Sequence, residues 1–299
     1  MSQRLVFALI ALAALGCAPA DTPPATPSVR RPHAQITTAQ TFDAQSVPAY
    51  TGSHDSTYAW IDANIAAHTR NLQRWVRQPS VSAQNLGIAE MAEVVRQDLE
   101  DLGFKEAELV PTSGHPGVWG YYDAGAEKTL AVYMMYDVQP VEPTGWSVDA
   151  FDGALVDRPL GRVLMARGAT NQKAPQRAFL NALEAIIKTR DSLPVNLMVV
   201  AEGEEELGSP NFGQVIDKYE SRLKTASGVF FPFNSQAPSG EVSMFLGVKG
   251  ILAFEIEARG GPHGGPVQAE IHGSYKVITD SPVLRLAQAI ASMTTPDGN

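Results

Sequence analysis

Apolar residues form two kinds of pattern along most of this chain: they recur every three or four positions, or they follow one another in short runs. Three segments carry apolar residues every three or four positions, which predicts amphipathic helices over 60–76, 85–102 and 176–189. Gly103 follows the second segment and is expected to end that helix, because glycine readily adopts the left-handed conformation found at helix C-termini.

Short apolar runs between these segments predict strands. Val118–Tyr122 and Thr129–Met135 are rich in Val and Tyr, whereas Val195–Ala201 is continuously apolar, as is typical of a strand buried on both faces. Alternation of strands and helices predicts an α/β fold with a mostly parallel sheet flanked by helices.

The pattern changes in the last fifth of the chain. Residues 252–258 alternate as in a half-buried strand, and Ser281-Pro282 predicts a helix start, as Ser209-Pro210 does earlier in the chain. We therefore expect a catalytic-type domain over 54–249 and the start of a smaller α+β lid or dimerisation domain over 250–299. One strand, one loop and one helix form no independent core, so we expect a sequence truncated at Asn299 relative to its parent architecture.

The beginning of the chain has the features of an export signal. Residues 1–17 contain Arg4, an apolar run over 5–15 and Gly16-Cys17, which together resemble a bacterial lipoprotein signal. We expect an exported protein of the cell envelope or periplasm, lipid-anchored at Cys17; the alternative is plain secretion with cleavage near 18–20. Residues 18–53 are rich in Pro, Thr, Ala and Ser and are expected to form a disordered tether.

The composition of the chain argues against several classes of function. A net charge of -9 without a basic cluster argues against a nucleic-acid partner. One cysteine permits no intramolecular disulfide, and nothing indicates an organic cofactor. Membrane contact is expected only through the lipid anchor.

Three polar segments follow predicted strands or precede a predicted helix, namely 133–140, 166–173 and 202–210. In open α/β sheets, ligands bind beyond the carboxyl ends of strands, where these segments fall. The third segment contains Glu202, Glu204, Glu205 and Glu206. One interpretation of this cluster is an acidic helix entry with solvated side chains. The other is a functional site, which binds a cation or contains a general base of raised pKa.

The same segments resemble the dinuclear zinc exopeptidases and deacylases, a family that includes carnosinase, carboxypeptidase G, acetylornithine deacetylase and succinyl-diaminopimelate desuccinylase. The resemblance runs from about residue 58 to the chain end. Its motifs are Tyr136-Asp137-Val138-Gln139-Pro140, Arg167-Gly168-Ala169-Thr170, Glu202-Gly203, Glu205-Glu206 and Gly208-Ser209-Pro210. It implies a phosphorylase/hydrolase-like zinc-peptidase domain, zinc or another divalent cation, a small peptide or N-acyl amino-acid ligand, and a homodimer.

The resemblance also implies individual roles. Glu205 matches the general base, Glu206 a zinc ligand, and Asp137 the carboxylate that orients the first histidine ligand. His272 matches the lid-domain histidine that binds substrate and the developing oxyanion; the alternative is a surface-loop histidine. His115 and His263 lie in Gly/Pro-containing loops and are expected to face solvent.

The chain departs from the family at its metal ligands. Met135 stands where the first histidine is expected, Asn171 where the bridging carboxylate is expected, and Phe233 at a further ligand position. The last histidine would fall beyond Asn299. Zinc prefers imidazole, thiolate and carboxylate, so a thioether and a neutral amide disfavour it. Because the surrounding motifs persist, we favour a variant branch with a rewired site over a decayed gene.

Three functions follow as hypotheses. The first is a zinc-peptidase-like hydrolase of peptide or N-acyl amino-acid amide bonds with an eroded or rewired metal site. The second is a non-catalytic envelope protein that binds peptides or amino-acid derivatives. The third is a truncated product that does not fold stably.

Overall fold

The computed structural model describes residues 51–142, 144–245, 247, 254–262 and 264–295. The predicted export signal, most of the predicted tether, residues 252–253 and His263 lie outside the described residues. All helices and strands below belong to the unit Ser53–Asn299. No helix in these described ranges is long and apolar enough to cross a membrane.

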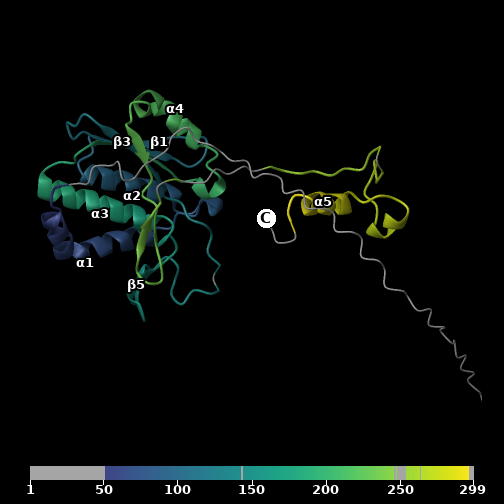
Figure 1. The fold of residues 1–299 in the computed structure, drawn as a ribbon, viewed down its shortest axis with the longest axis horizontal. Coiled ribbons are helices and arrows are strands. Elements are labelled where there is room, and N and C mark those ends of the chain that lie inside the picture. The colour runs from purple at the N-terminus through teal and green to yellow at the C-terminus, as the bar shows by residue number, and fades with distance from the viewer. Residues whose placement is uncertain (1–50, 143, 246, 248–253, 263, 296–299) are drawn as a thin grey trace, which may run out of the picture. The chain divides into compact units, whose positions relative to one another are not determined.

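Two helices and then five strands come first in this unit, and helices and strands alternate from α3 to β7 (Figure 1). The α-helices are α1 (Asp55–Arg77), α2 (Ile88–Asp101), α3 (Lys173–Arg190), α4 (Phe212–Leu223) and α5 (Pro282–Ala291). The strands are β1 (Glu106–Val110), β2 (Gly117–Tyr122), β3 (Thr129–Met135), β4 (Ala154–Arg158), β5 (Gly161–Met165), β6 (Asn196–Glu202), β7 (Gly228–Phe230), β8 (Asn234–Gln236) and β9 (Val242–Met244).

Five strands form the central sheet in the order β1-β2-β6-β3-β7. Strand β3 runs parallel to its neighbours β6 and β7, whereas β2 runs antiparallel to its neighbours β1 and β6. The α/β class is confirmed, and the sheet is mixed, with its parallel half around β3. Two hairpins, β4–β5 and β8–β9, form separate two-stranded sheets.

Strand β6 is buried along its whole length because helices cover both faces of the sheet. Leu197, Val199 and Ala201 pack in the core cluster that also contains buried residues of α1, α2 and α3. Met198 and Val200 point to the opposite face and pack with Val215 and Tyr219 of α4. The alternation follows from the two-residue period of a strand, and it explains why β6 is apolar at every position between Asn196 and Glu202.

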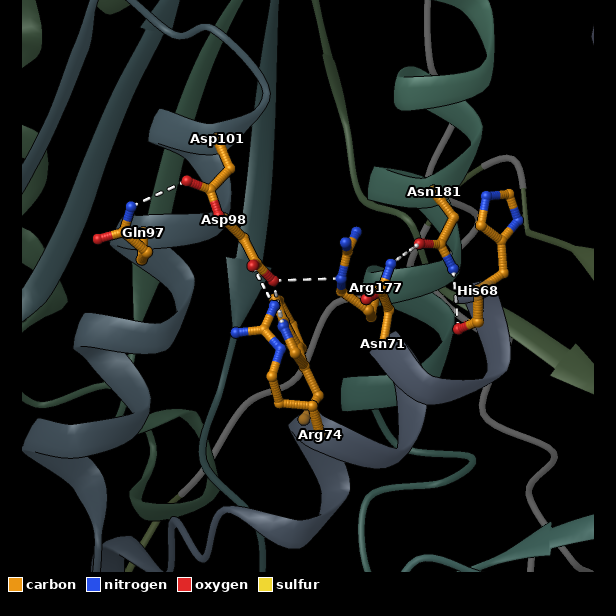
Figure 2. Close-up of polar contacts among 9 residues, drawn as sticks. His68, Asn71, Arg74, Gln97, Asp98, Asp101, Arg177 and Asn181 are labelled. Carbon is orange, nitrogen blue, oxygen red and sulfur yellow. Dashed lines mark hydrogen bonds and ion pairs between the residues drawn. The ribbon is translucent and has the colours of Figure 1, made fainter. Parts of the chain in front are cut away.

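A buried carboxylate on α2 joins three helices of this core. Asp98 accepts hydrogen bonds from Arg74 and from Trp75 Nε1, the latter at 2.5 Å, and both donors belong to α1. Its Oδ2 lies 3.1 Å from Nε of Arg177 on α3. Figure 2 shows this carboxylate between the two guanidinium groups, with the Asn71–Asn181 contact farther along the α1–α3 interface.

Most of the predicted elements are present. Strand β3 has the predicted bounds, and Gly103 has φ 87, the left-handed conformation expected just beyond α2. The prediction for Ser281 is also confirmed, because its Oγ accepts the Leu284 N–H at the start of α5.

Two predictions of local structure were wrong. Ser209 does not begin a helix: it has φ 56, its hydroxyl donates to Glu202, and α4 begins only at Phe212. Residues 254–258, the described part of the predicted strand over 252–258, are not in a strand.

Candidate active site

Asp137 lies two residues beyond β3 and is fully buried. Its Oδ1 accepts the backbone N–H of Glu205 at 3.2 Å, and its Oδ2 accepts the N–H of Glu206 at 3.1 Å. The Ser82 hydroxyl also donates to Oδ2, at 2.7 Å. The carboxylate therefore fixes the position of the loop that carries Glu205 and Glu206.

The acidic loop, residues 202–209, begins at the end of β6. Strands β3 and β6 are parallel, with Met135 opposite Glu202, so their carboxyl ends bring the segment after β3 and the acidic loop to one edge of the sheet. Glu205 and Glu206 lie in η3 (Glu205–Leu207), a single 3₁₀ turn closed by Gly208 at φ 84.

Glu206 is bound by two side-chain amides. Asn171 Nδ2 donates to Glu206 Oε1 at 3.3 Å, and Gln139 Nε2 donates to Oε2 at 2.8 Å. We call these three residues the amide–carboxylate clamp. Each of the two carboxylate oxygens thus has a neutral donor from a different segment, one after β3 and one before α3.

Two other glutamates of the loop face inward. Glu202 is buried, and its Oε1 accepts from the hydroxyls of Tyr133 at 2.7 Å and Ser209 at 2.8 Å. Glu204 is also buried; its Oε2 accepts from Asn211 Nδ2 at 2.8 Å and its Oε1 from the backbone N–H of His115 at 3.2 Å. These bonds make the interpretation of a fully solvated acidic helix entry wrong.

Burial of so many carboxylates changes their acidity. Burial raises the pKa of Asp137, despite the opposing hydrogen bonds from Ser82 and the loop backbone. Burial also raises the pKa of Glu202. The pKa of Glu205 is raised first by burial and then by the neighbouring charges of Glu206 and Asp137. A general base of raised pKa, one of the readings that the sequence left open, fits this environment.

Lys173 is the cationic residue at the start of α3, close to the clamp in sequence. Its side chain is fully buried and its ammonium donates to the Gln78 carbonyl. Burial lowers its pKa to about 7, an effect that attraction to Asp137 opposes. The neighbouring Asn171–Gln172 peptide bond is cis.

The residues at the family's metal-ligand positions do not fit a pair of zinc ions. Met135 presents a buried thioether, and the Asn171 amide donates to Glu206. Phe233 packs in an aromatic row, with ring centroids 5.3 Å from Phe231 and 5.5 Å from Phe245. Among the described residues, no group of three or more His, Cys, Asp or Glu side chains could hold a metal ion. Zinc sites are generally built from three or four such ligands.

The two described histidines singled out by the sequence differ in their surroundings. His272 caps η4 (Gly273–Val277), where its Nδ1 accepts the Ser274 N–H at 3.2 Å. It is exposed within its own segment, and its substrate-binding role stays a prediction. His115 was expected to face solvent, but it is half-buried, and its Nε2 lies 3.2 Å from the Ser82 carbonyl oxygen.

Sequence reasoning assigned no hydrogen-bonding role to Ser82, Gln139 or His115. Gln139 lies within the recognised motif 136–140, so its position beside Asp137 was a usable signal. Ser82 is 55 residues from Asp137 along the chain, and nothing in the sequence pattern links the two.

Residues 131–298 match Peptidase family M20/M25/M40. The Cys-Gly metallodipeptidase dug1 of Schizosaccharomyces pombe is 28% identical over 262 residues, which are 82% of this chain and 53% of that protein. The Beta-Ala-His dipeptidase of Homo sapiens is 28% identical over 266 residues, covering 82% of this chain and 50% of that protein.

Solved structures share the fold of this chain. A M20 family metallo-carboxypeptidase from Sulfolobus solfataricus superposes with a TM-score of 0.61 and 30% identity, covering 78% of this chain and 51% of that one. The di-peptidase Dug1p from Saccharomyces cerevisiae has a TM-score of 0.59 at 23% identity, covering 83% and 54%.

The fold and the matched motifs define a metallopeptidase-type α/β domain, and the chain belongs to Peptidase family M20/M25/M40. The predicted family resemblance is confirmed. The chain spans about half the length of the curated relatives it matches.

Proposed function

We propose that this protein hydrolyses the amide bond of short peptides or N-acyl amino acids, with Glu205 as general base. Its family membership and two relatives named as dipeptidases support this substrate class. The observation that carries the proposal is the placement of Glu205, whose backbone N–H is bonded to buried Asp137 and whose carboxylate is half-buried with a raised pKa.

The reaction requires one water and the amide. Glu205 takes a proton from the water, whose oxygen bonds to the amide carbonyl carbon. The C–N bond then breaks, and the proton on Glu205 passes to the leaving nitrogen, which restores the carboxylate. The raised pKa of Glu205 makes it a stronger base than an exposed glutamate and keeps its conjugate acid able to protonate the amine.

The test compares Glu205→Gln with Glu220→Gln, an exposed glutamate on α4. A panel of dipeptides and N-acyl amino acids is assayed with and without added Zn²⁺, Mn²⁺ or Co²⁺. We expect Glu205→Gln to lower kcat by about 10²-fold or more, the contribution of a general base, and Glu220→Gln to leave it unchanged. No turnover by the unaltered protein under any condition would reject the proposal.

A second function is favoured by the amide–carboxylate clamp. Because neutral donors already satisfy Glu206, the acidic loop and the clamp can hold a peptide or amino-acid derivative without cleaving it. Calorimetry against the same panel separates the two functions. Binding with no product formed over hours supports the binding protein, and product formation by the same sample rejects it.

The location of the protein is also a proposal. Gly16-Cys17 after an apolar run supports export and lipid anchoring at Cys17, with the folded unit held at the cell envelope. Expression in a bacterial host with labelled palmitate tests this. We expect label in the unaltered protein and none in Cys17→Ser; equal label in both would contradict it. The family resemblance further supports a homodimer, which light scattering would detect.

A further inference from the structure

We infer that the acidic loop works without a tightly bound transition-metal ion, because the amide–carboxylate clamp takes the place that metal ions hold in the family. The clamp describes the resting state of the site, whether the protein hydrolyses its ligand or only binds it.

The orientation of the clamp is the first argument. Asn171 and Gln139 each direct an N–H toward Glu206, with N···O distances of 3.3 Å and 2.8 Å. A cation bound to Glu206 would meet the positive ends of these two amide dipoles. If the Asn171 amide were turned over, two oxygens would face each other at about hydrogen-bond distance, which is repulsive. The hydrogen-bonded arrangement is thus the stable one for neutral amides.

The surroundings of Asp137 provide a second argument. In a histidine-based zinc site, such a carboxylate accepts a ring N–H of the metal-binding histidine. Here Asp137 accepts from Ser82 and from two loop N–H groups. The expected histidine position holds Met135, which is 2% exposed and whose side chain has no N–H. The carboxylate has become a fixed support for the loop.

The ligand count is the third argument. Structural and catalytic zinc sites use at least three protein ligands drawn from imidazole, thiolate and carboxylate. Of the family positions in the described residues, Glu206 alone has such a group, since Met135, Asn171 and Phe233 do not. One carboxylate that is already hydrogen-bonded on both oxygens holds a divalent cation only weakly.

The experiment measures metal in the full chain rather than its activity. The unaltered protein and the variants Asn171→Asp and Met135→His/Asn171→Asp are purified, dialysed against chelator, loaded with Zn²⁺, and analysed by elemental analysis and calorimetry. For the unaltered protein we expect less than about one tenth of an equivalent of retained zinc. For the double variant we expect zinc affinity raised about 10-fold or more, although the site is not fully rebuilt.

Asn171→Asp alone guards against misfolding, because it is nearly isosteric and lies at an exposed position. It should show a smaller gain in zinc affinity, with an unchanged circular dichroism spectrum. One or two equivalents of zinc retained by the unaltered protein would overturn the inference, as would equal zinc affinity in all three proteins. Retained zinc with hydrolysis would reject only this inference, whereas neither zinc nor hydrolysis would reject only the proposed activity.

Discussion

Two regions of this domain bury carboxylates and treat them in opposite ways. Asp98 lies between the guanidinium groups of Arg74 and Arg177, so its charge is neutralised where three helices meet (Figure 2). Asp137 and the acidic loop receive mainly hydroxyl and amide donors, and burial raises the pKa of several of these carboxylates. The first arrangement stabilises the fold. The second retains costly negative charge, as sites of ligand binding or catalysis often do.

Removing the paired carboxylate should have the largest effect on stability. Asp98→Ala leaves buried Arg177 and the Trp75 N–H without their acceptor, which costs about 3–5 kcal/mol of unfolding free energy. Urea denaturation measures this loss. Asp101→Asn is the matched control on the same helix, where Asp101 is exposed and accepts from Gln97; its change should stay within about 0.5 kcal/mol. A similar loss in both variants would show that Asp98 stabilises the fold no more than an exposed aspartate of the same helix does.

The second prediction concerns Gly203 in the acidic loop, where there is no room for a larger side chain. A Cβ added at Gly203 would lie 2.5 Å from the ring of Tyr136, which is fully buried. Gly203→Ala should therefore cost about 1–3 kcal/mol by overpacking and displace the loop. Gly213→Ala on α4 is the control, since an added Cβ there meets nothing within 4 Å. Thermal unfolding with an unchanged midpoint for Gly203→Ala would show that the loop yields easily.

The unneutralised charge should appear in the pH dependence of stability. The pKa of Glu202 in the folded protein lies above its ordinary value of 4.5, so the folded state holds this proton more tightly than the unfolded state. Stability is therefore lost as pH rises through the folded pKa. In Glu202→Gln, unfolding free energy should fall less between mildly acidic and neutral pH than in the unaltered protein. Equal slopes in denaturation series would contradict this.

The smallest effect is expected at the clamp. Gln139 is exposed, and Gln139→Ala removes one neutral donor from Glu206 while water can replace it. The free energy of unfolding should fall by less than about 1 kcal/mol. A loss as large as that of Asp98→Ala would mean that the clamp, too, is mainly a stabilising device.

Local sequence patterns predicted the parts of the fold that local forces determine. The bounds of β3 and the end of α2 at Gly103 follow from apolar spacing and backbone preference. Ser209 was misassigned because its hydroxyl bonds Glu202, a partner brought close by the fold of the loop. Spacing also gave no sign that β1 and β2 run antiparallel to their neighbours, since strand direction depends on distant pairing.

The candidate site also combines residues that local motifs predict with residues that only distant contacts bring together. Asp137, Glu205 and Glu206 were found from linked motifs, and the structure brings them together. The donors that complete the site were not predicted, because Ser82 is 55 residues away from Asp137 and Gln139 is 67 residues away from Glu206. Asp98 was likewise not singled out, since its partner Arg177 reaches it from a separate helix.

The strand order has a consequence for synthesis on the ribosome. Strand β6 is inserted between β2 and β3, yet roughly 60 residues, 136–195, separate the end of β3 from its start. At translation rates of about 5–20 residues per second, the nascent chain waits about 3–12 s before the two facing strand edges receive their partner. During this interval Val118 and Val132, both later buried, have no β6 to cover them. We therefore expect these two strand edges to stay unpaired, and open to association with other chains, until residue 202 has left the exit tunnel.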